Sequence, residues 1–335
     1  MSMDQQPRPP VTKVDQPLDQ ALREEARALA AKAEAYDGIE AISEAPLLAL
    51  RDGARNVTHF LVMDDAALAG YAQLDAEHVS AEVVVDPDRR RTGVGTALIK
   101  ALGATAPAVR IWAHGDLPAA QAAARSIGVV PVRELWEMTV DRTGADLDRS
   151  RPEGWTRHRF RTFNPATDRS AWVDLNAAAF ANHPEQGKWT LEDLDRRMAE
   201  LWFDPAALIL AFPTDQRPKS GPPALGHSTA HPVQPSSLPA NTGTKPAAGQ
   251  SPVGYVWGKV TGQIGEIYAI GVHPSAQGQR LGTYLLKLGL EHLEGRGVTE
   301  IRLFVEADNT PAIAAYNRQG FRVTRRDVQY ASNRA

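Results

Sequence analysis

The chain of 335 residues contains no cysteine, which excludes disulfides, thiolate metal sites and a cysteine nucleophile. It has no apolar run of about 18 residues and no export signal at its start, so we expect neither a membrane span nor secretion. A net charge of -3 gives no excess of positive charge for binding nucleic acid or an anionic membrane. These absences leave a cytoplasmic protein without a metal cofactor as the expectation.

One stretch combines a strand, a short turn and a helix. Ile264 to Val272 is rich in β-branched and aromatic residues and predicts a strand, which His273-Pro274 ends. The turn Gln277 to Gly282 then leads into a helix with leucines at helical spacing. Backbone N–H groups at such a helix start converge on one point, with the positive end of the helix dipole behind them. The stretch therefore predicts an anion-binding site.

Two kinds of anion site are candidates for this turn. The dinucleotide-binding fingerprint needs G-x-G-x-x-G spacing, and Gly278 and Gly282 are too far apart to be its first pair. The turn instead resembles the pattern Q/R-x-x-G-x-G/A, the pyrophosphate-binding turn of the Gcn5-related N-acetyltransferases (the GNAT family). Arg280 replaces the middle glycine, and because its backbone N–H remains, we expect binding to persist. A single short motif also fits an ordinary strand-turn-helix.

The same arrangement occurs earlier, after the strand Ala81 to Val85, with Arg90, Gly93 and Gly95 in register. Each copy is followed by a helix, a strand, a second helix and a glycine that opens a last strand. Such repetition indicates two similar domains in tandem, which also suits a chain too long for one core. We expect an α+β fold, with a mixed sheet flanked by helices in each of two tandem GNAT (acyl-CoA N-acyltransferase) domains.

The expected domain boundaries follow from composition. Residues 1–15 predict a disordered tail, 16–141 an N-terminal non-catalytic GNAT domain, and 142–152 a linker. Residues 153–335 predict a C-terminal catalytic GNAT domain. Within it, residues 213–252 are rich in Pro, Ser, Gly and Thr and predict a disordered insertion. The first helix is expected from Gln16 to Tyr36.

Two residues of the second half are candidates for acid–base chemistry. Glu266 is a lone acid among the apolar residues of its strand, and a carboxylate with a raised pKa suffices to take a proton from an amine. Tyr316 lies in the stretch Asn309 to Phe321, which resembles the acetyltransferase pattern N-x-x-A-x-x-x-Y-x-x-x-G-F. In that family the tyrosine hydroxyl reaches the cofactor sulfur, where a phenol can protonate a departing thiolate. The bland alternatives are a solvated glutamate and a core tyrosine.

A comparison of the halves predicts which one reacts. Aligning the two Pro-containing strand ends puts Val79 where Glu266 stands, and aligning Gly128 with Gly320 puts Ala124 where Tyr316 stands. The first half therefore keeps the phosphate turn without the acid and base. We expect it to bind acyl-CoA without turnover, or to serve only as a scaffold and a wall of the substrate site. We expect replacement of Glu266 and Tyr316 to abolish turnover.

The whole chain apart from the tail and insertion resembles the mycothiol synthase family of tandem-domain actinobacterial acetyltransferases. The resemblance rests on Trp112 to Gly115, Ala179 to Gly187, Trp202 to Pro205 with Leu208 to Phe212, and Val305 to Asn309. That family moves acetyl from acetyl-CoA to the cysteinyl amine of Cys-GlcN-Ins (a cysteinyl-glucosaminyl-inositol), the last step of mycothiol biosynthesis.

The resemblance implies residue roles. It implies substrate contacts at Glu44, Glu185, Lys259, Glu266 and Phe304, where Phe304 stands in place of the family's tyrosine. It implies acetyl-CoA contacts in the first half at Val83, Val84, Val85, Arg91, Thr92, Gly93, Val94, Gly95 and Thr96. In the second half it implies such contacts at Ile270, Gly271, Val272, Gln277, Gly278, Gln279, Arg280, Leu281, Gly282, Thr283, Asn309, Thr310, Pro311, Ala312, Ile313 and Ala314.

Two alternatives stay open. One is a GNAT enzyme that acetylates another amine, on an antibiotic or a peptide, and the other is a non-catalytic CoA-binding module. If the chain is an enzyme, we expect a small-molecule substrate and a monomer.

Overall fold

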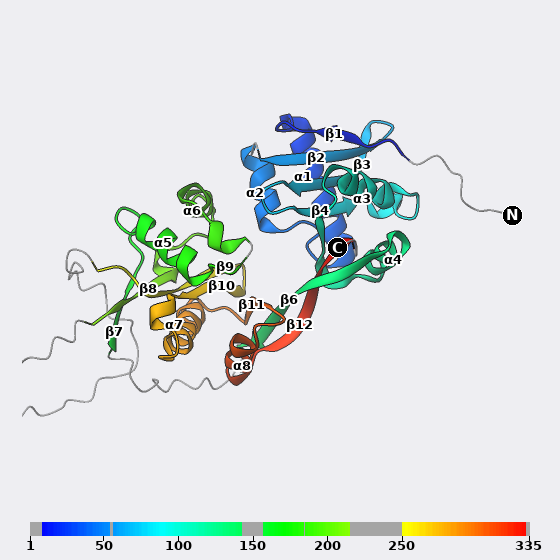
Figure 1. Cartoon of the computed structure of the whole chain (residues 1–335). Helices are drawn as coiled ribbons and strands as arrows, with labels where there is room; N and C mark the ends of the chain where they lie inside the picture. The colour runs from blue at the N-terminus through cyan, green and yellow to red at the C-terminus, as the bar shows by residue number, and fades with distance from the viewer. Residues whose placement is uncertain (1–8, 54–55, 143–156, 184, 215–249, 333–335) are drawn as a thin grey trace, which may run out of the picture. The chain divides into compact units, whose positions relative to one another are not determined.

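The computed structural model describes residues 9–53, 56–142, 157–183, 185–214 and 250–332 (Figure 1). Contacts group the chain into two compact units. The first contains Met1–Met138 with Phe304–Ala335, and the second contains Thr139–Leu303. Residues 143–152 of the expected linker and most of the expected insertion at 213–252 lie outside the described residues. Pro213, expected to open the disordered insertion, is instead the last residue of a strand, Leu208–Pro213.

The first unit is a mixed sheet with helices. Its strands lie in the order β1-β2-β3-β4-β5-β12-β6, and α1, α2, α3, α4 and α8 belong to the same unit. The elements are β1 (Thr12–Val14), α1 (Gln20–Asp37), α2 (Glu44–Asp52), β2 (Val57–Asp64), β3 (Ala67–Asp75), β4 (Ser80–Val85), α3 (Val94–Thr105), β5 (Arg110–Ala113), α4 (Pro118–Ile127), β6 (Val129–Asp141), α8 (Thr310–Arg318) and β12 (Arg322–Ser332).

Strand pairing explains why the end of the chain belongs to the first unit. β12 pairs with β5 antiparallel, with Val328 opposite Ala113, whereas β4 and β5 pair in parallel. The division of the chain by contacts therefore differs from the division by sequence repeat, which groups all residues from 153 onward. The parallel pair beside antiparallel neighbours confirms the expected mixed sheet and α+β class.

Two expected boundaries are corrected at the amino end. Thr12–Val14, expected in the disordered tail, forms β1 and pairs antiparallel with His59–Leu61 of β2. The first helix starts at Gln20 instead of Gln16, because the Asp19 side chain accepts a hydrogen bond from the Leu22 N–H and caps the helix there. Gly38, at φ 71°, ends it.

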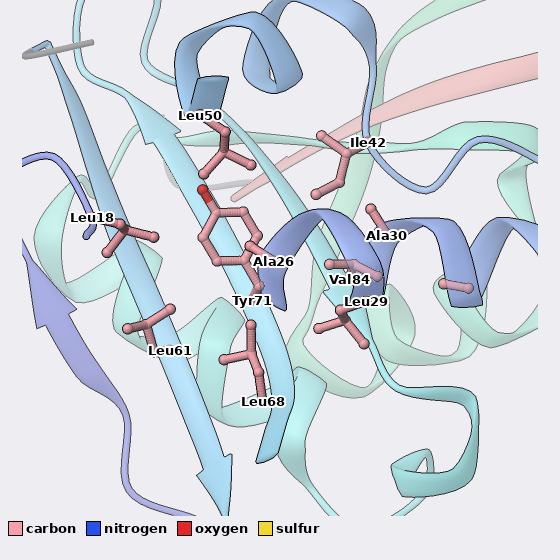
Figure 2. Packing of buried hydrophobic residues seen from close by; sticks show 11 residues of the cluster. Leu18, Ala26, Leu29, Ala30, Ile42, Leu50, Leu61, Leu68, Tyr71 and Val84 are labelled. Atoms are coloured by element: carbon pink, nitrogen blue, oxygen red, sulfur yellow. The ribbon is translucent and has the colours of Figure 1, made fainter. Parts of the chain in front are cut away.

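Helices cover both faces of the first unit's sheet. On one face, α1 and α2 pack on β2, β3 and β4 through a cluster that Figure 2 shows around Tyr71. On the other face, Val94, Leu98 and Leu102 of α3 pack with alternate residues of the same strands. The Tyr71 hydroxyl is buried, and it bonds to His59 Nδ1 and Gln73 Oε1, both at 2.8 Å. Pairing of this kind removes the cost of burying those polar atoms.

The second unit repeats this plan. Its strands lie in the order β11-β10-β9-β8-β7. The elements are β7 (His158–Thr162), α5 (Arg169–Ala179), α6 (Leu191–Met198), β8 (Leu208–Pro213), β9 (Gly254–Thr261), β10 (Ile264–Val272), α7 (Leu281–Gly295) and β11 (Glu300–Glu306), whose last three residues fall in the first unit. Thr190 and Asp193 form a capping box at α6. Trp172 and Trp257 are fully buried and meet edge to face, 5.4 Å apart.

A glycine brings each turn-following helix close to its sheet. A Cβ on Gly70 would lie 2.4 Å from Val94 Cγ1 of α3, and one on Gly254 would lie 2.9 Å from Leu285 Cδ1 of α7. Gly70 lies opposite Val85, and Gly254 lies opposite Val272, the strand ends from which the two turns depart. Glycine at this position therefore fixes the depth at which both helix starts rest on the sheet.

Candidate active site

The second anion turn lies at the surface. Gln277, Gly278, Gln279 and Arg280 are exposed, and the residues after them enter α7. Arg280 is the N-cap residue and contributes no side-chain hydrogen bond to the helix, whereas α1 and α6 are capped by side chains. The first N–H groups of α7 have no carbonyl partner within the helix, which suits them to phosphate oxygens.

The first turn has the same backbone. Arg91 at φ 68° and Gly93 at φ 92° correspond to Gly278 at φ 75° and Arg280 at φ 61°. Gly93 likewise caps α3 without a side-chain bond. The Arg90 guanidinium, which opens this copy of the motif, donates to both carboxylate oxygens of Asp37 at 2.8 and 2.7 Å. The two turns thus have one conformation, and Arg90 ties the first one to the end of α1.

Arg280 adopts a left-handed conformation that costs an L residue about 1 kcal/mol or more. Replacing Arg280→Gly is therefore expected to raise the free energy of unfolding, by up to about 1 kcal/mol after the entropy of the added glycine is subtracted. Urea unfolding measures the change. Arg280→Ala is the control, because it removes the same side chain and keeps the strained backbone. A glycine variant no more stable than the alanine variant would contradict the assignment of strain.

Glu266 lies in a row of charged residues across three strands. It is 7% exposed, so the solvated alternative is excluded. Lys259 of β9 stands directly opposite it on one side and Arg302 of β11 on the other. Arg302 Nε donates to Glu266 Oε2 at 3.0 Å. Glu266 is the single acid of β10, as expected, and the Arg302 guanidinium that pairs with it favours its ionised form.

Sequence reasoning missed Arg302, and the signal for it lay in strand register. β10 and β11 are parallel, so a residue 36 positions later faces Glu266 directly. No local motif marks that distance. The register of two predicted strands would have to be fixed first, and a slip of one residue would turn Arg302 to the other face.

The structure also corrects the residue matched to Glu266 in the first half. β10 contains one extra residue between Ile267 and Ala269 relative to β9, whereas β3 and β4 pair without a shift. Counting back from the turn through this bulge at Tyr268 matches Glu266 to Ser80 instead of Val79. The conclusion that the first half lacks this acid is unchanged.

Tyr316 lies on α8, in the first unit, and is 7% exposed. Burial raises its pKa to about 12, so the phenol is protonated and able to donate at neutral pH. Asn309 caps α8 by accepting a hydrogen bond from the Ala312 N–H. The matching position in α4 is Ala124, whose carbonyl accepts from the Gly128 N–H. Glu266 belongs to the second unit.

The remaining expected substrate contacts divide between the units. Lys259 faces Glu266 in the second unit, and its Nζ lies 4.7 Å from the centre of the Trp202 ring. Glu185 is half-buried in the same unit. Glu44 is the first residue of α2, and the Phe304 ring lies 5.6 Å from the Arg325 guanidinium, both in the first unit.

A chain of alternating charge is buried in the first unit. Glu82 receives hydrogen bonds from the Ser43 N–H and hydroxyl at 2.7 and 2.5 Å. His114 Nε2 lies 3.4 Å from Glu82, and its Nδ1 lies 3.2 Å from Asp327. Asp327 also pairs with Arg325 Nε at 3.1 Å. Its members come from four distant parts of the sequence, so no sequence pattern indicated it.

The charges along this chain decide the protonation states. Burial alone would lower the pKa of His114, but the Glu82 charge and the Asp327 hydrogen bond outweigh it and raise that pKa to about 10. Burial alone would raise the pKa of Glu82 and Asp327, and contact with His114 lowers both. The histidine is therefore an imidazolium between two carboxylates at neutral pH.

Within the described residues, no helix is long and apolar enough to cross a membrane. The same residues contain no group of three or more His, Cys, Asp or Glu arranged to hold a metal ion.

Comparison with known proteins places these features in context. The model of the acetyltransferase (GNAT) family matches residues 21–128 and 224–321. A protein of Catenulispora acidiphila named mycothiol acetyltransferase is 38% identical over 330 residues, covering 91% of this chain and 93% of its own. A protein of the same name from Thermomonospora curvata is 41% identical over 312 residues, covering 91% of this chain and 92% of its own.

Solved structures share the fold at lower identity. A GCN5-related N-acetyltransferase from Sphaerobacter thermophilus has a TM-score of 0.61 at 22% identity, covering 96% of this chain and 94% of its own. A tandem GNAT protein of the clavulanic acid biosynthesis pathway has a TM-score of 0.62 at 17% identity, covering 96% and 98%. These likenesses concern the fold and confirm two tandem domains of one kind.

Proposed function

Because the chain belongs to the acetyltransferase (GNAT) family, we propose that it transfers acetyl from acetyl-CoA to the cysteinyl amine of Cys-GlcN-Ins, completing mycothiol. The observation that carries the choice of acceptor is the 38 to 41% identity to proteins named mycothiol acetyltransferase, over nine-tenths of both chains. The chain is an acetyltransferase, and its acceptor is the part that needs a test.

The two helix starts suit the pyrophosphate of acetyl-CoA. Both α3 and α7 begin at a residue in the left-handed conformation, without a side-chain cap. Their first N–H groups, together with the positive helix ends, supply donors for phosphate oxygens. We assign the acetyl-CoA contacts to Gln277 to Thr283 with Ile270 to Val272 in the second half, and to Arg91 to Thr96 with Val83 to Val85 in the first. Asn309 to Ala314 completes the assigned contacts.

The proton transfers are assigned to Glu266 and Tyr316. The ionised Glu266 takes a proton from the acceptor's α-amino group, whose ordinary pKa is about 8. The amine nitrogen then bonds to the carbonyl carbon of the acetyl group, the carbon–sulfur bond of acetyl-CoA breaks, and CoA departs as a thiolate. Tyr316 holds its proton because burial raises its pKa to about 12, and it donates that proton to the sulfur. Lys259, Glu185, Glu44 and Phe304 are assigned contacts with the polyhydroxylated acceptor.

The first half is assigned binding without turnover. Ser80 and Ala124 occupy the positions of Glu266 and Tyr316, and neither side chain can serve as a base or acid at neutral pH. Its turn has the backbone of the second turn, so retention of acetyl-CoA there is consistent with the geometry.

An acetyl-CoA-dependent thiol-release assay tests the acceptor. Purified protein is expected to release CoA with Cys-GlcN-Ins and not with glucosaminyl-inositol, which shares the sugar and lacks the cysteinyl amine. Mass spectrometry should find one added acetyl on the cysteinyl nitrogen. Release with an aminoglycoside or a peptide amine, and none with Cys-GlcN-Ins, would favour the other GNAT acceptors. Binding of acetyl-CoA with no release on any amine would favour a binding module.

A further inference from the structure

The charged row at Glu266 is a built feature of the second unit's sheet. Lys259, Glu266 and Arg302 occupy directly opposite positions on β9, β10 and β11. Residues directly opposite one another point to the same face of a sheet, with Cβ atoms about 5 Å apart. The Glu266 and Arg302 side chains are 10% and 22% exposed, so their ion pair is screened only weakly by solvent.

The row points away from α7. A Cβ on Gly265 would meet Leu293 of α7 at 3.4 Å, and a Cβ on Gly289 of that helix would meet Ile267 at 2.8 Å. Because side chains alternate along a strand, Glu266 lies on the opposite face. Arg197 of α6 lies on that side, where its Nε donates to the Tyr268 hydroxyl at 2.7 Å.

The charged groups placed on this face include one acid and three cations, of which Arg302 bonds to the acid. The cations are Lys259 from β9, Arg302 from β11 and Arg197 from α6, with Tyr268 as the neighbouring neutral titratable group. Each positive charge favours the ionised form of a carboxylate nearby. Arg302 adds a hydrogen bond at 3.0 Å from a planar guanidinium, which restricts the orientation of the carboxylate.

We propose that Arg302 is a positioning residue for acetyl transfer, which keeps Glu266 ionised and oriented to accept the proton of the acceptor amine. The inference rests on the proposed function, because it requires Glu266 to be the base. A base is useful only in its deprotonated form, so the pairing sets how far into the acidic range the enzyme stays active.

The first unit supplies an internal comparison. Its corresponding row is Asp75, Ser80 and Arg110, again directly opposite on β3, β4 and β5. Arg110 Nη2 donates to the His78 carbonyl oxygen at 2.9 Å. An arginine therefore ends the row in both units. The middle residue of the row is an acid, Glu266, in the second unit and Ser80 in the first. Arg110→Gln is thus a matched control for loss of a strand arginine.

The test compares Arg302→Gln, Arg302→Lys and Arg110→Gln with the wild-type enzyme. Without the guanidinium, Glu266 should ionise at higher pH, so the acidic limb of kcat/KM in Arg302→Gln should move up by about one pH unit. Activity below that limb should then fall about tenfold, while the KM for acetyl-CoA stays unchanged. Arg302→Lys keeps the positive charge and should keep the wild-type limb, with a lower maximum because a single ammonium orients the carboxylate less well. Arg110→Gln should keep both the acidic limb and the maximum of the wild-type pH profile.

A second readout does not require turnover. Carbon NMR of the side-chain carboxyls, with Glu266 assigned by difference against Glu266→Gln, should show its titration midpoint displaced upward in Arg302→Gln. An unmoved midpoint, or a variant that loses activity equally at every pH along with its melting temperature, would overturn the inference. Absence of transfer to Cys-GlcN-Ins by the wild-type enzyme would count against the proposed function alone, since the titration still reports on Arg302.

Discussion

Glu266→Gln is expected to lower kcat/KM for the cysteinyl acceptor by roughly 100- to 10,000-fold, the range in which general bases contribute. Glutamine has nearly the same shape, and its carbonyl oxygen can still accept the bond that Arg302 donates at 3.0 Å. The substitution therefore removes the basic oxygen with little disturbance of the row. Steady-state kinetics of CoA release measure the loss.

The pH dependence of the residual rate identifies the cause. Without a base, the acceptor must lose its own proton, and an α-amino group does so near pH 8. The activity of Glu266→Gln should therefore rise through about pH 8, and its deficit relative to the wild-type enzyme should narrow there. A deficit of constant size at every pH would mean that Glu266 holds the acceptor without taking its proton.

Glu300→Gln provides the control for charge. Glu300 lies on β11 opposite Ile264, two residues before Arg302. Its substitution therefore removes one negative charge from the same pair of strands without changing the row at Glu266. It should leave the kinetics near the wild-type values. A comparable loss in both variants would indicate a general electrostatic effect on acceptor binding.

The features of this site that the sequence predicts are local ones. Local patterns predicted the two turns, since a strand end, a glycine turn and a leucine-rich helix lie next to one another in the chain. The caps of α8 at Asn309 and of α6 at Thr190 with Asp193 are equally local. Each of these features depends on residues within one or two turns of each other, where spacing alone fixes the geometry.

Features set by pairing between distant strands were missed. The bulge at Tyr268 moved the match of Glu266 from Val79 to Ser80, because an added residue in one strand leaves no local trace. Arg302 could be placed beside Glu266 only once the register of two parallel strands was known. β12 pairs with β5 of the first unit, although the repeat assigned it to the second, because a strand's sequence does not specify its partner.

His114→Leu is expected to lower the free energy of unfolding by about 3 to 5 kcal/mol, the cost of leaving a buried charge without its partner. Glu82 and Asp327 both lose the imidazolium, and Asp327 retains its pair with Arg325 at 3.1 Å. Glu82 and Asp327 lie 3.4 and 3.2 Å from the imidazole and are 5% and 3% exposed, so water cannot replace the lost charge. Urea unfolding at neutral pH measures the change.

The pH dependence has a defined sign. The folded-state pKa of His114, about 10, lies above its ordinary value of 6.5, so its contribution is complete below pH 6.5 and is lost as pH rises through about 10. Asp327 and Glu82 have lowered pKa values, so their contributions are present above their ordinary 3.8 and 4.5 and are lost as pH falls further. The network therefore contributes most between about pH 5 and pH 6.5.

His114→Leu should depend on pH in the opposite sense on the acid side. In His114→Leu, protonation of the two carboxylates that lost the imidazolium relieves part of the cost of burying them, so the difference in unfolding free energy from the wild-type protein should shrink as pH falls below about 5. Adding Glu82→Gln and Asp327→Asn to His114→Leu removes both buried charges and should restore part of the lost stability at neutral pH, because amides at these positions can still bond to Ser43 and to the Gly115 N–H. If the triple variant were no more stable than His114→Leu, the loss would come from the cavity around residue 114 instead of from unpaired charge.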